Sequence, residues 1–172
     1  DYYREAFGIH VFNLRLPMIF LVPSEPYYLV DGKKKTMPFL NIICKAIKGY
    51  PLEVWGDKDM RRDYVHVENL ISMVVSCAES NLKGGTFNVG TGEGATTEQF
   101  IRTIARVFGS SKKDIEIRYK PEKPAYKCAV YDIQEEKEKL GYKPIFLEEM
   151  LNLLRDEMYT RNVVEDWCKG IN

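Results

Sequence analysis

The sequence predicts an α/β fold, because short apolar runs of strand character alternate with longer segments of helical periodicity. Strand character is clear at Leu52–Trp55 and Thr86–Val89, and apolar side chains recur at helical spacing through Met37–Lys48. Gly49 follows that helical segment, as glycine commonly does beyond a helix C-terminus. Neither an internal repeat nor a low-complexity linker divides the 172 residues. We therefore expect residues 1–172 to form a single folded portion.

The individual elements follow from apolar spacing and from the residues that end each run. The expected helices are Asp1–Phe7, Met37–Lys48, His66–Ser80, a helix that begins at Thr97, Gln134–Leu140 and Leu147–Cys168. The expected strands are Ile9–Phe20, Leu52–Trp55, Thr86–Val89 and Ile115–Tyr119, with a loop at Pro23–Pro26. Pro17 has no N–H for a strand ladder, so the first strand is expected to break there. Either Thr96 or Thr97 can supply the oxygen that caps the helix at residue 97.

The composition is that of a folded domain, with 45% hydrophobic residues. Lys+Arg and Asp+Glu both number 25, and this zero net charge argues against a general nucleic-acid-binding surface. No apolar run approaches the roughly 20 residues of a membrane span. The N-terminus lacks a charged region followed by an apolar stretch and a cleavage site, so we expect a cytoplasmic protein without a membrane partner.

The four cysteines are scattered along the chain at Cys44, Cys77, Cys128 and Cys168. They show no C-x-x-C pairing, and with only two histidines a zinc site has little support. We expect no metal site and interpret the cysteines as buried thiols of a reducing compartment.

Adjacent arginines stand in the segment Gly56–Leu70, between a Gly-Asp turn and an alternating Tyr-Val-His-Val run. The guanidinium groups of Arg61 and Arg62 are planar forks of donors that match phosphate oxygens two at a time. This arrangement suits a bound diphosphate. The alternative is a solvated charged turn, since most arginines lie at protein surfaces.

Five landmarks occur in a defined order along nearly the whole chain: Val11–Leu16 after a helix end; Gly49–Asp57; Arg62–Val67; Phe87–Gly92; and Asp132 with Leu140–Pro144. In this order and spacing the chain resembles the C-terminal portion of an extended short-chain dehydrogenase/reductase. The resemblance is to the NAD-dependent epimerase/dehydratase family, which acts on nucleotide-activated sugars. It implies a substrate-binding lobe plus the last strands and helices of an incomplete Rossmann sheet.

Two further landmarks of that family are not found in this sequence. The Gly90–Gly94 loop follows a strand but lacks the spacing of a G-x-G-x-x-G dinucleotide fingerprint. Tyr2 and Tyr3 are followed four positions later by Ala6 and Phe7, so neither forms the Tyr-x-x-x-Lys pair of the family. We therefore expect no catalytic residue and no cofactor site in this chain, with NAD or NADP bound by an N-terminal Rossmann half of the complete protein.

The resemblance also assigns substrate-binding roles. Arg62 matches the family arginine that binds the diphosphate of the sugar nucleotide, and the alternative is a structural salt bridge with Asp63 or another carboxylate. Lys123 lies where many relatives carry a second phosphate- or ribose-binding arginine, although lysine lacks the bidentate fork. Trp55 is a candidate for stacking on the nucleobase, although the family's base-contacting strand could use its backbone instead; the other alternative is a partly buried core tryptophan. Arg61 is expected to face outward.

Three other positions are interpreted more conservatively. His66 is expected to be structural, because an imidazole on a strand without an obvious carboxylate or serine partner nearby in sequence is a poor case for general acid–base catalysis. Arg15, on an apolar strand, is expected to need a buried partner, for which Asp63 is a candidate. Relatives carry an Asn and a Tyr-Gly-Pro turn where this chain has Leu16–Pro23, and Met18 cannot supply amide hydrogen bonds. The pocket is thus expected to be remodelled, to bind another ligand, or to have lost binding.

Two functional hypotheses follow. The first is the nucleotide-sugar-binding portion of an NAD(P)-dependent epimerase or dehydratase, not catalytic alone, whose partners are the nucleotide-sugar substrate, the N-terminal Rossmann half and a second copy of the chain. The homo-oligomer is expected because Val11–Leu16 and Phe87–Val89 would belong to a sheet with exposed edges. The alternative is a non-catalytic binding or interaction module derived from the same family.

Overall fold

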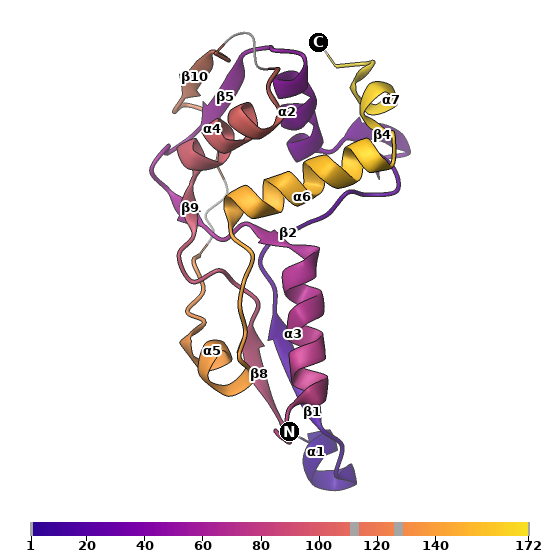
Figure 1. Ribbon diagram of the computed structural model, residues 1–172, viewed down its shortest axis with the longest axis vertical. Helices are drawn as coiled ribbons and strands as arrows, with labels where there is room; N and C mark the ends of the chain where they lie inside the picture. Colours follow the sequence, from indigo (N-terminus) through magenta and orange to yellow (C-terminus); the bar gives the residue numbers. More distant parts are fainter. Residues whose placement is uncertain (1, 111–113, 126–128, 172) are drawn as a thin grey trace. The chain divides into compact units, whose positions relative to one another are not determined.

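The computed structural model of the protein describes residues 2–110, 114–125 and 129–171 (Figure 1). These residues group into two compact units, each built from three separate stretches of chain. Unit 1 consists of the described residues within Asp1–Phe20, Arg61–Ala95 and Cys128–Phe146, and unit 2 of those within Leu21–Met60, Thr96–Lys127 and Leu147–Asn172. Residues far apart in the sequence therefore meet in the core of each unit.

Unit 1 contains two short parallel strand pairs. Strand β1 (Val11–Arg15) pairs with β8 (Gly84–Asn88), with Val11 opposite Gly84 and Arg15 opposite Asn88. Strand β2 (Ile19–Phe20) pairs with β7 (Val65–His66). The break between β1 and β2 falls around Pro17, which confirms the interruption predicted from that residue. The short strand β6 (Arg61–Arg62) lies just before β7, and β9 (Ala95–Thr96) spans the boundary of the two units.

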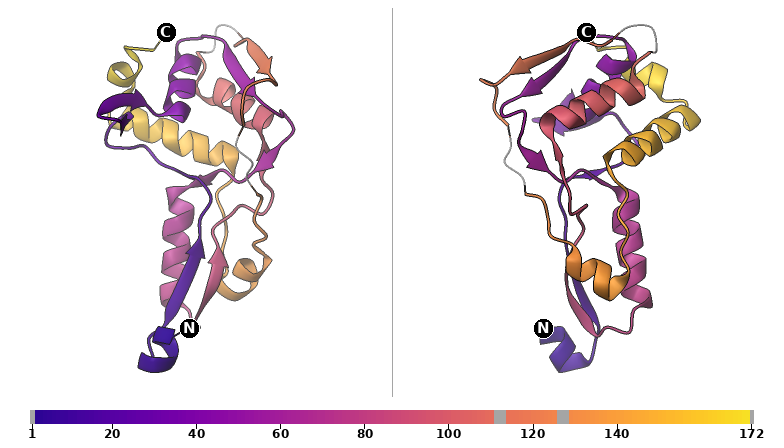
Figure 2. Two further views of the ribbon diagram at one scale, coloured as in Figure 1. Left: turned by 180° about the vertical axis from the view of Figure 1, so that it is seen from behind. Right: turned by 60° about the vertical axis from the view of Figure 1, so that its left-hand side comes forward.

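Helices α1 (Tyr2–Phe7), α3 (Val67–Glu79) and α5 (Gln134–Leu140) complete unit 1. Figures 1 and 2 show α3 running alongside the β1–β8 pair, and α5 contacts both α3 and β8. Gly84 is required for the close approach of the strands, because a Cβ atom there would lie 2.3 Å from the carbonyl oxygen of Val11. The buried core of this unit consists of Val65, Met73, Cys77, Phe87, Val89, Ile133 and Tyr142.

Unit 2 contains the parallel pair of β5 (Leu52–Trp55) and β10 (Ile117–Lys120), together with four helices. The helices are α2 (Pro38–Ile47), α4 (Thr97–Phe108), α6 (Leu147–Thr160) and α7 (Val164–Cys168). Helix α4 contacts α2, α6 and β5, so it is the centre of this unit's packing. Its apolar face is fully buried at Phe100, Ile101, Ile104 and Phe108. Thr96 caps the helix in a reciprocal capping box with Gln99, which resolves the choice between Thr96 and Thr97.

An antiparallel hairpin in unit 2 was not among the expected elements. Strands β3 (Tyr27–Val30) and β4 (Lys33–Thr36) are joined by a two-residue turn at Asp31 and Gly32. Both turn residues have positive φ, 50° and 72°. Asp-Gly between two runs of strand character is a strong hairpin signal, so the sequence did contain the information.

The prediction of one helix over Leu147–Cys168 is wrong. The chain forms α6 and then a separate α7, and Asn162 between them has a φ of 54°. This left-handed conformation cannot continue a right-handed helix, and asparagine adopts it more readily than most residues. The other expected helices are confirmed to within one or two residues over their described parts, as are the expected strands. Across the described residues, no helix combines the length and the apolar character needed to cross a membrane.

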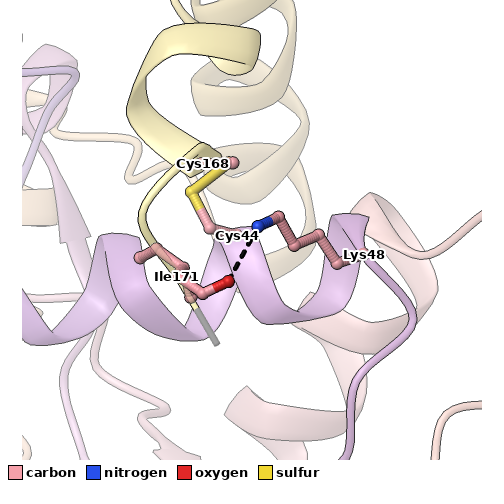
Figure 3. Close-up of a disulfide and its surroundings, with 4 residues drawn as sticks. All are labelled: Cys44, Lys48, Cys168 and Ile171. Carbon is pink, nitrogen blue, oxygen red and sulfur yellow. Dashed lines mark hydrogen bonds between the residues drawn. A yellow bond between two sulfur atoms is a disulfide. The ribbon is translucent and has the colours of Figure 1, made fainter.

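The expectation that all four cysteines are thiols is also wrong. Cys44 and Cys168 form a disulfide that links α2 to α7 (Figure 3). Their separation of 124 residues gave no local signal of the pairing. Cys77 is a buried free thiol, as expected, and Cys128 lies outside the described residues.

Candidate functional site

Asp63 is the anchor of the arginine-containing segment in unit 1. Its side chain is buried, and Oδ1 accepts hydrogen bonds from the backbone N–H of Thr91 (2.9 Å) and from the Thr91 hydroxyl. Oδ2 accepts a bond of 2.7 Å from the backbone N–H of Tyr131. A buried carboxylate is costly unless it is hydrogen-bonded, and here three donors offset that cost. Asp63 therefore joins three separate segments of the chain at one point.

The expected pairing of Arg15 with Asp63 is wrong, because Arg15 is exposed and the described acceptor bonds of Asp63 come from Thr91 and Tyr131. Side chains alternate along β1, so that Phe12 and Leu14 pack against the core of unit 1 while Arg15 lies on the opposite side. The sequence shows that apolar and polar side chains alternate along this strand, but it does not show which neighbours either set contacts.

The two arginines of β6 differ in environment. Arg61 is exposed, as expected, and its Nη1 donates to the carbonyl oxygens of Glu93 (3.0 Å) and Gly94 (3.2 Å). Arg62 is half-buried and directly precedes the anchored Asp63. Its carbonyl oxygen would lie 3.1 Å from a Cβ atom on Gly94. The backbone around Arg62 is therefore closely packed against the loop that follows β8.

The glycines of that loop are needed for packing against the chain itself. A Cβ atom on Gly90 would lie 2.8 Å from the Tyr131 side chain, and one on Gly92 would lie 2.8 Å from Ile133. A Cβ atom on Gly94 would lie 2.4 Å from the Val130 side chain. Side chains of residues 130–133 thus occupy the space that the missing Cβ atoms leave. Packing against the chain itself therefore accounts for the three glycines.

Tyr142 and Glu136 hold the same loop from another side. The Tyr142 hydroxyl donates to the carbonyl oxygen of Gly90 at 3.1 Å. Burial raises the pKa of Tyr142 well above its ordinary value, and the carboxylates of Asp63 and Glu136 raise it further. The phenol therefore stays protonated and remains a hydrogen-bond donor. Glu136 is itself buried and accepts a bond from the backbone N–H of Asn88 at the end of β8.

His66 has a structural contact consistent with its expected role. It is buried at the N-cap position of α3, and its Nδ1 accepts a hydrogen bond of 3.2 Å from the backbone N–H of Glu68. This bond satisfies one of the N–H groups that a helix N-terminus leaves without an intrahelical partner.

Trp55 and Lys123 come together in unit 2, at the end of β5. The indole is 45% exposed, so it lies on the surface rather than in the core. Its Nε1 donates to Oε2 of Glu53 at 2.7 Å, and Nζ of Lys123 lies 5.6 Å from the ring centroid. This distance is within the range of a cation–π interaction.

Gly56 explains how Lys123 reaches Trp55. A Cβ atom on Gly56 would lie 2.6 Å from the Cβ of Ala125 and 3.4 Å from the carbonyl oxygen of Lys123. The N–H of Gly56 also donates to the carbonyl oxygen of Lys120, which closes a turn by accepting from the N–H of Lys123. The absence of a side chain at Gly56 thus allows residues 123–125 to fold over the end of β5. An exposed indole beside an ammonium group can bind a planar, negatively charged ligand.

Of the three predicted site residues, the structure brings Trp55 and Lys123 together, and it places Arg62 in the other unit. The contribution of Asp63 to the segment of Arg62 was missed. Its partners Thr91 and Tyr131 lie 28 and 68 residues further along the chain. The one signal in the sequence was that Asp63 directly follows Arg62.

Comparison with known proteins gives consistent results. A model of the NAD dependent epimerase/dehydratase family matches residues 1–90, which is more than half of the chain. The chain is 30% identical over 125 residues to a dTDP-4-dehydro-6-deoxyglucose reductase of Escherichia coli, covering 70% of this chain and 38% of the relative. It is 28% identical over 175 residues to UDP-glucuronic acid decarboxylase 1 of Arabidopsis thaliana, covering 99% of this chain and 37% of the relative.

Solved structures show the same fold. The UDP-glucose 4-epimerase of Thermotoga maritima, crystallised with UDP-glucose, superposes with a TM-score of 0.70 at 24% identity, covering 94% of this chain and 50% of that chain. A UDP-glucuronic acid 4-epimerase of Bacillus cereus gives a TM-score of 0.68 at 22% identity, with 93% and 48% covered. The chain spans about half or less of the length of these proteins. It belongs to the NAD-dependent epimerase/dehydratase family, and its α/β fold is that of about half of these extended short-chain dehydrogenase/reductase structures.

Proposed function

We propose that this chain is the nucleotide-sugar-binding portion of an NAD(P)-dependent epimerase or dehydratase. The observation that carries the proposal is the anchoring of Asp63, which holds the backbone beside Arg62 in place through three hydrogen bonds. A guanidinium on a fixed backbone loses less conformational freedom when it binds a diphosphate. Family membership supports the nature of the ligand, because relatives are named for UDP- and dTDP-linked sugars.

Trp55 and Lys123 of unit 2 are proposed as a separate contact point that suits a nucleobase. The exposed indole offers a surface on which a pyrimidine base can stack, and the Lys123 ammonium offers a positive charge beside it. Lysine supplies a point charge rather than the bidentate fork of an arginine, so its contribution is expected to be smaller than that of Arg62.

The role of this portion in the reaction is orientation and specificity. When bound, NAD(P) supplies the chemistry of hydride transfer. In the enzymes that this chain resembles, a tyrosinate removes the proton of the sugar hydroxyl. We propose that the tyrosine, the lysine and the cofactor site belong to an N-terminal half of the complete protein. The residues of this chain would then hold the nucleotide sugar so that the reacting carbon is correctly placed.

We further propose that the complete protein is a cytoplasmic homo-oligomer. The apolar side chains of Ile71, Val74 and Val75 are each about half exposed on α3, and covering them against a second copy would remove them from water. The second candidate function is that of an interaction module, which binds a partner in this way and no longer binds a nucleotide sugar. The replacement of the usual turn by Leu16–Pro23, with Met18 exposed, is the observation that favours it.

Calorimetric titration of the intact protein with UDP-glucose and with dTDP-glucose tests the proposal. Loss of a charge-assisted hydrogen bond costs about 1.5–3 kcal/mol, so Arg62→Ala should weaken binding by about tenfold to more than a hundredfold. Arg62→Lys should recover part of the loss, because it keeps the charge without the fork. Arg61→Ala is the matched control and should leave the affinity nearly unchanged. An affinity unaffected by Arg62→Ala, or no binding of either nucleotide sugar by the intact protein, would overturn the proposal.

A further inference from the structure

The disulfide between Cys44 and Cys168 ties the C-terminal helix to the body of unit 2. Cys44 lies in α2 and Cys168 is the last residue of α7, and their Cα atoms are 5.2 Å apart. Both residues are nearly inaccessible, at 1% and 4% exposure. Figure 3 shows the bond joining the two helices where the chain turns back toward α2.

Besides the disulfide, a small buried cluster and a hydrogen bond hold α7 and the residues after it on α2. The buried cluster at this point contains Cys44, Cys168 and Ile171, with Ile47 and Val164 packed partly against it. One hydrogen bond of 2.7 Å runs from Nζ of Lys48 to the carbonyl oxygen of Ile171 (Figure 3).

Helix α7 is also weak by itself. It has five residues, and no side chain caps its N-terminus at Val163. Isolated helices shorter than about 12–15 residues are marginal in water. The covalent bond is therefore the principal restraint on α7.

Arg161 holds the end of α6 in place, so a release of α7 would not extend into α6. Its guanidinium donates to the carbonyl oxygens of Val22 and Pro23, each at 2.8 Å, and stacks 5.8 Å from the centroid of Trp167. The first two contacts attach the end of α6 to unit 2 without involving α7. Asn162, with its φ of 54°, follows immediately and forms a natural pivot.

We infer that the Cys44–Cys168 disulfide is a redox-modification site, and that its reduction releases residues 164–171 from α2 while the rest of unit 2 stays folded. The reductant is a dithiol, either a small molecule or a dithiol protein. In compartments that keep thiols reduced, the disulfides that do form are usually transient or redox-sensing. This inference is independent of the nucleotide-sugar proposal.

The chemistry is thiol–disulfide exchange. One thiolate of the reductant attacks Sγ of one cysteine, the Sγ–Sγ bond breaks, and the other cysteine leaves as a thiolate that takes up a proton from water. The second thiolate of the reductant then displaces the first cysteine, which is protonated in turn. The reductant ends as a disulfide and has delivered two electrons to the Cys44–Cys168 pair.

Hydrogen exchange measured by mass spectrometry on the intact protein tests the inference, with and without dithiothreitol. Alkylation before and after reduction shows the state of Cys44 and Cys168. On reduction, amide exchange in residues 164–171 should accelerate at least tenfold, and exchange in α4 and α6 should be unchanged. Equal exchange of α7 in both redox states, or a loss of protection throughout unit 2, would overturn the inference. So would complete alkylation of both cysteines after treatment with oxidised glutathione.

Three variants sharpen the test. Cys168→Ser should show fast α7 exchange under both conditions, whereas Cys77→Ser, which removes the buried free thiol of α3, should respond to dithiothreitol as the wild type does. Lys48→Met keeps both cysteines but removes the hydrogen bond to Ile171, so α7 should keep slow exchange while the disulfide is intact and lose it on reduction. Fast α7 exchange in oxidised Lys48→Met would contradict the role of the disulfide as the principal restraint on α7.

Discussion

Asp63 accepts two hydrogen bonds from the single residue Thr91, one from its backbone N–H and one from its hydroxyl. The same hydroxyl oxygen accepts a bond of 3.1 Å from the N–H of Gly94. Thr91 is therefore both donor and acceptor between the arginine-containing segment and the end of the loop. Removal of the charge at Asp63 should therefore lower the free energy of unfolding.

The first prediction is that Asp63→Asn lowers the free energy of unfolding by about 2–3 kcal/mol, because one charge-assisted bond is lost and an amide N–H₂ then faces the N–H of Tyr131. Urea denaturation of the intact protein measures the change. Asp59→Asn is the matched control, since Asp59 is exposed and pairs at the surface with Lys58. Equal stabilities for Asp63→Asn and Asp59→Asn would show that the buried network contributes nothing.

Local signals in the sequence predicted a large part of the fold. Helices α2 and α5 are each followed by a glycine at positive φ, Gly49 and Gly141, and their ends were predicted closely. Strand β5 was predicted at its observed residues, because Pro51 and Gly56 mark the two ends of a short run with apolar alternation. These features depend on residues within a few positions of one another.

Features that depend on distant residues were not predicted. The disulfide joins residues 124 positions apart, and nothing near Cys44 distinguishes it from Cys77. The partners of Asp63 likewise lie far along the chain, so its burial was assigned to the wrong neighbour, Arg15. The pairing of Trp55 with Lys123 depends on the turn over Gly56, whose packing role is seen only in three dimensions.

The second prediction concerns the loop that follows β8. Gly92 and Gly141 have similar positive φ angles of 78° and 63°, but only Gly92 has protein atoms where a Cβ would be placed. Gly141→Ala should therefore lose about 1 kcal/mol for the backbone conformation alone. Gly92→Ala should lose a further 1–3 kcal/mol, roughly the cost of overpacking against Ile133. Thermal and urea denaturation of both variants provides the comparison, and the packing role of Gly92 is refuted if the two lose the same amount.

The third prediction concerns Trp55, one of two tryptophans in the chain. If a nucleobase stacks on it, the intrinsic fluorescence of Trp55 should be quenched when UDP is added to the intact protein. The Trp167→Phe variant should keep the quenching, because Trp167 lies in α7 with its ring beside Arg161, and the Trp55→Phe variant should lose it. Lys123→Met should weaken UDP binding less than Arg62→Ala does, since lysine lacks the fork. Identical quenching in both tryptophan variants would remove Trp55 from the site.

The last prediction is that the 172-residue chain produced alone forms a dimer or a larger species. The exposed apolar side chains of Ile71, Val74 and Val75 lie along α3, and Val74 is 50% exposed. Specific interfaces usually bury more than about 1,000 Å² in total, and α3 runs alongside the β1–β8 pair of unit 1 (Figure 2), so both can contribute to such contact. Sedimentation velocity at micromolar concentrations measures the state.

Val74→Asp should shift that equilibrium toward the monomer, because a buried carboxylate without a partner is strongly disfavoured. Leu29→Asp is the matched control: it makes the same kind of change on the exposed β3–β4 hairpin of unit 2, where Leu29 is 66% exposed, and it should leave the association unchanged. A wild-type chain that sediments as a monomer at high micromolar concentration would contradict the prediction. Weakening of association by Leu29→Asp and not by Val74→Asp would instead move the interface from α3 to the hairpin.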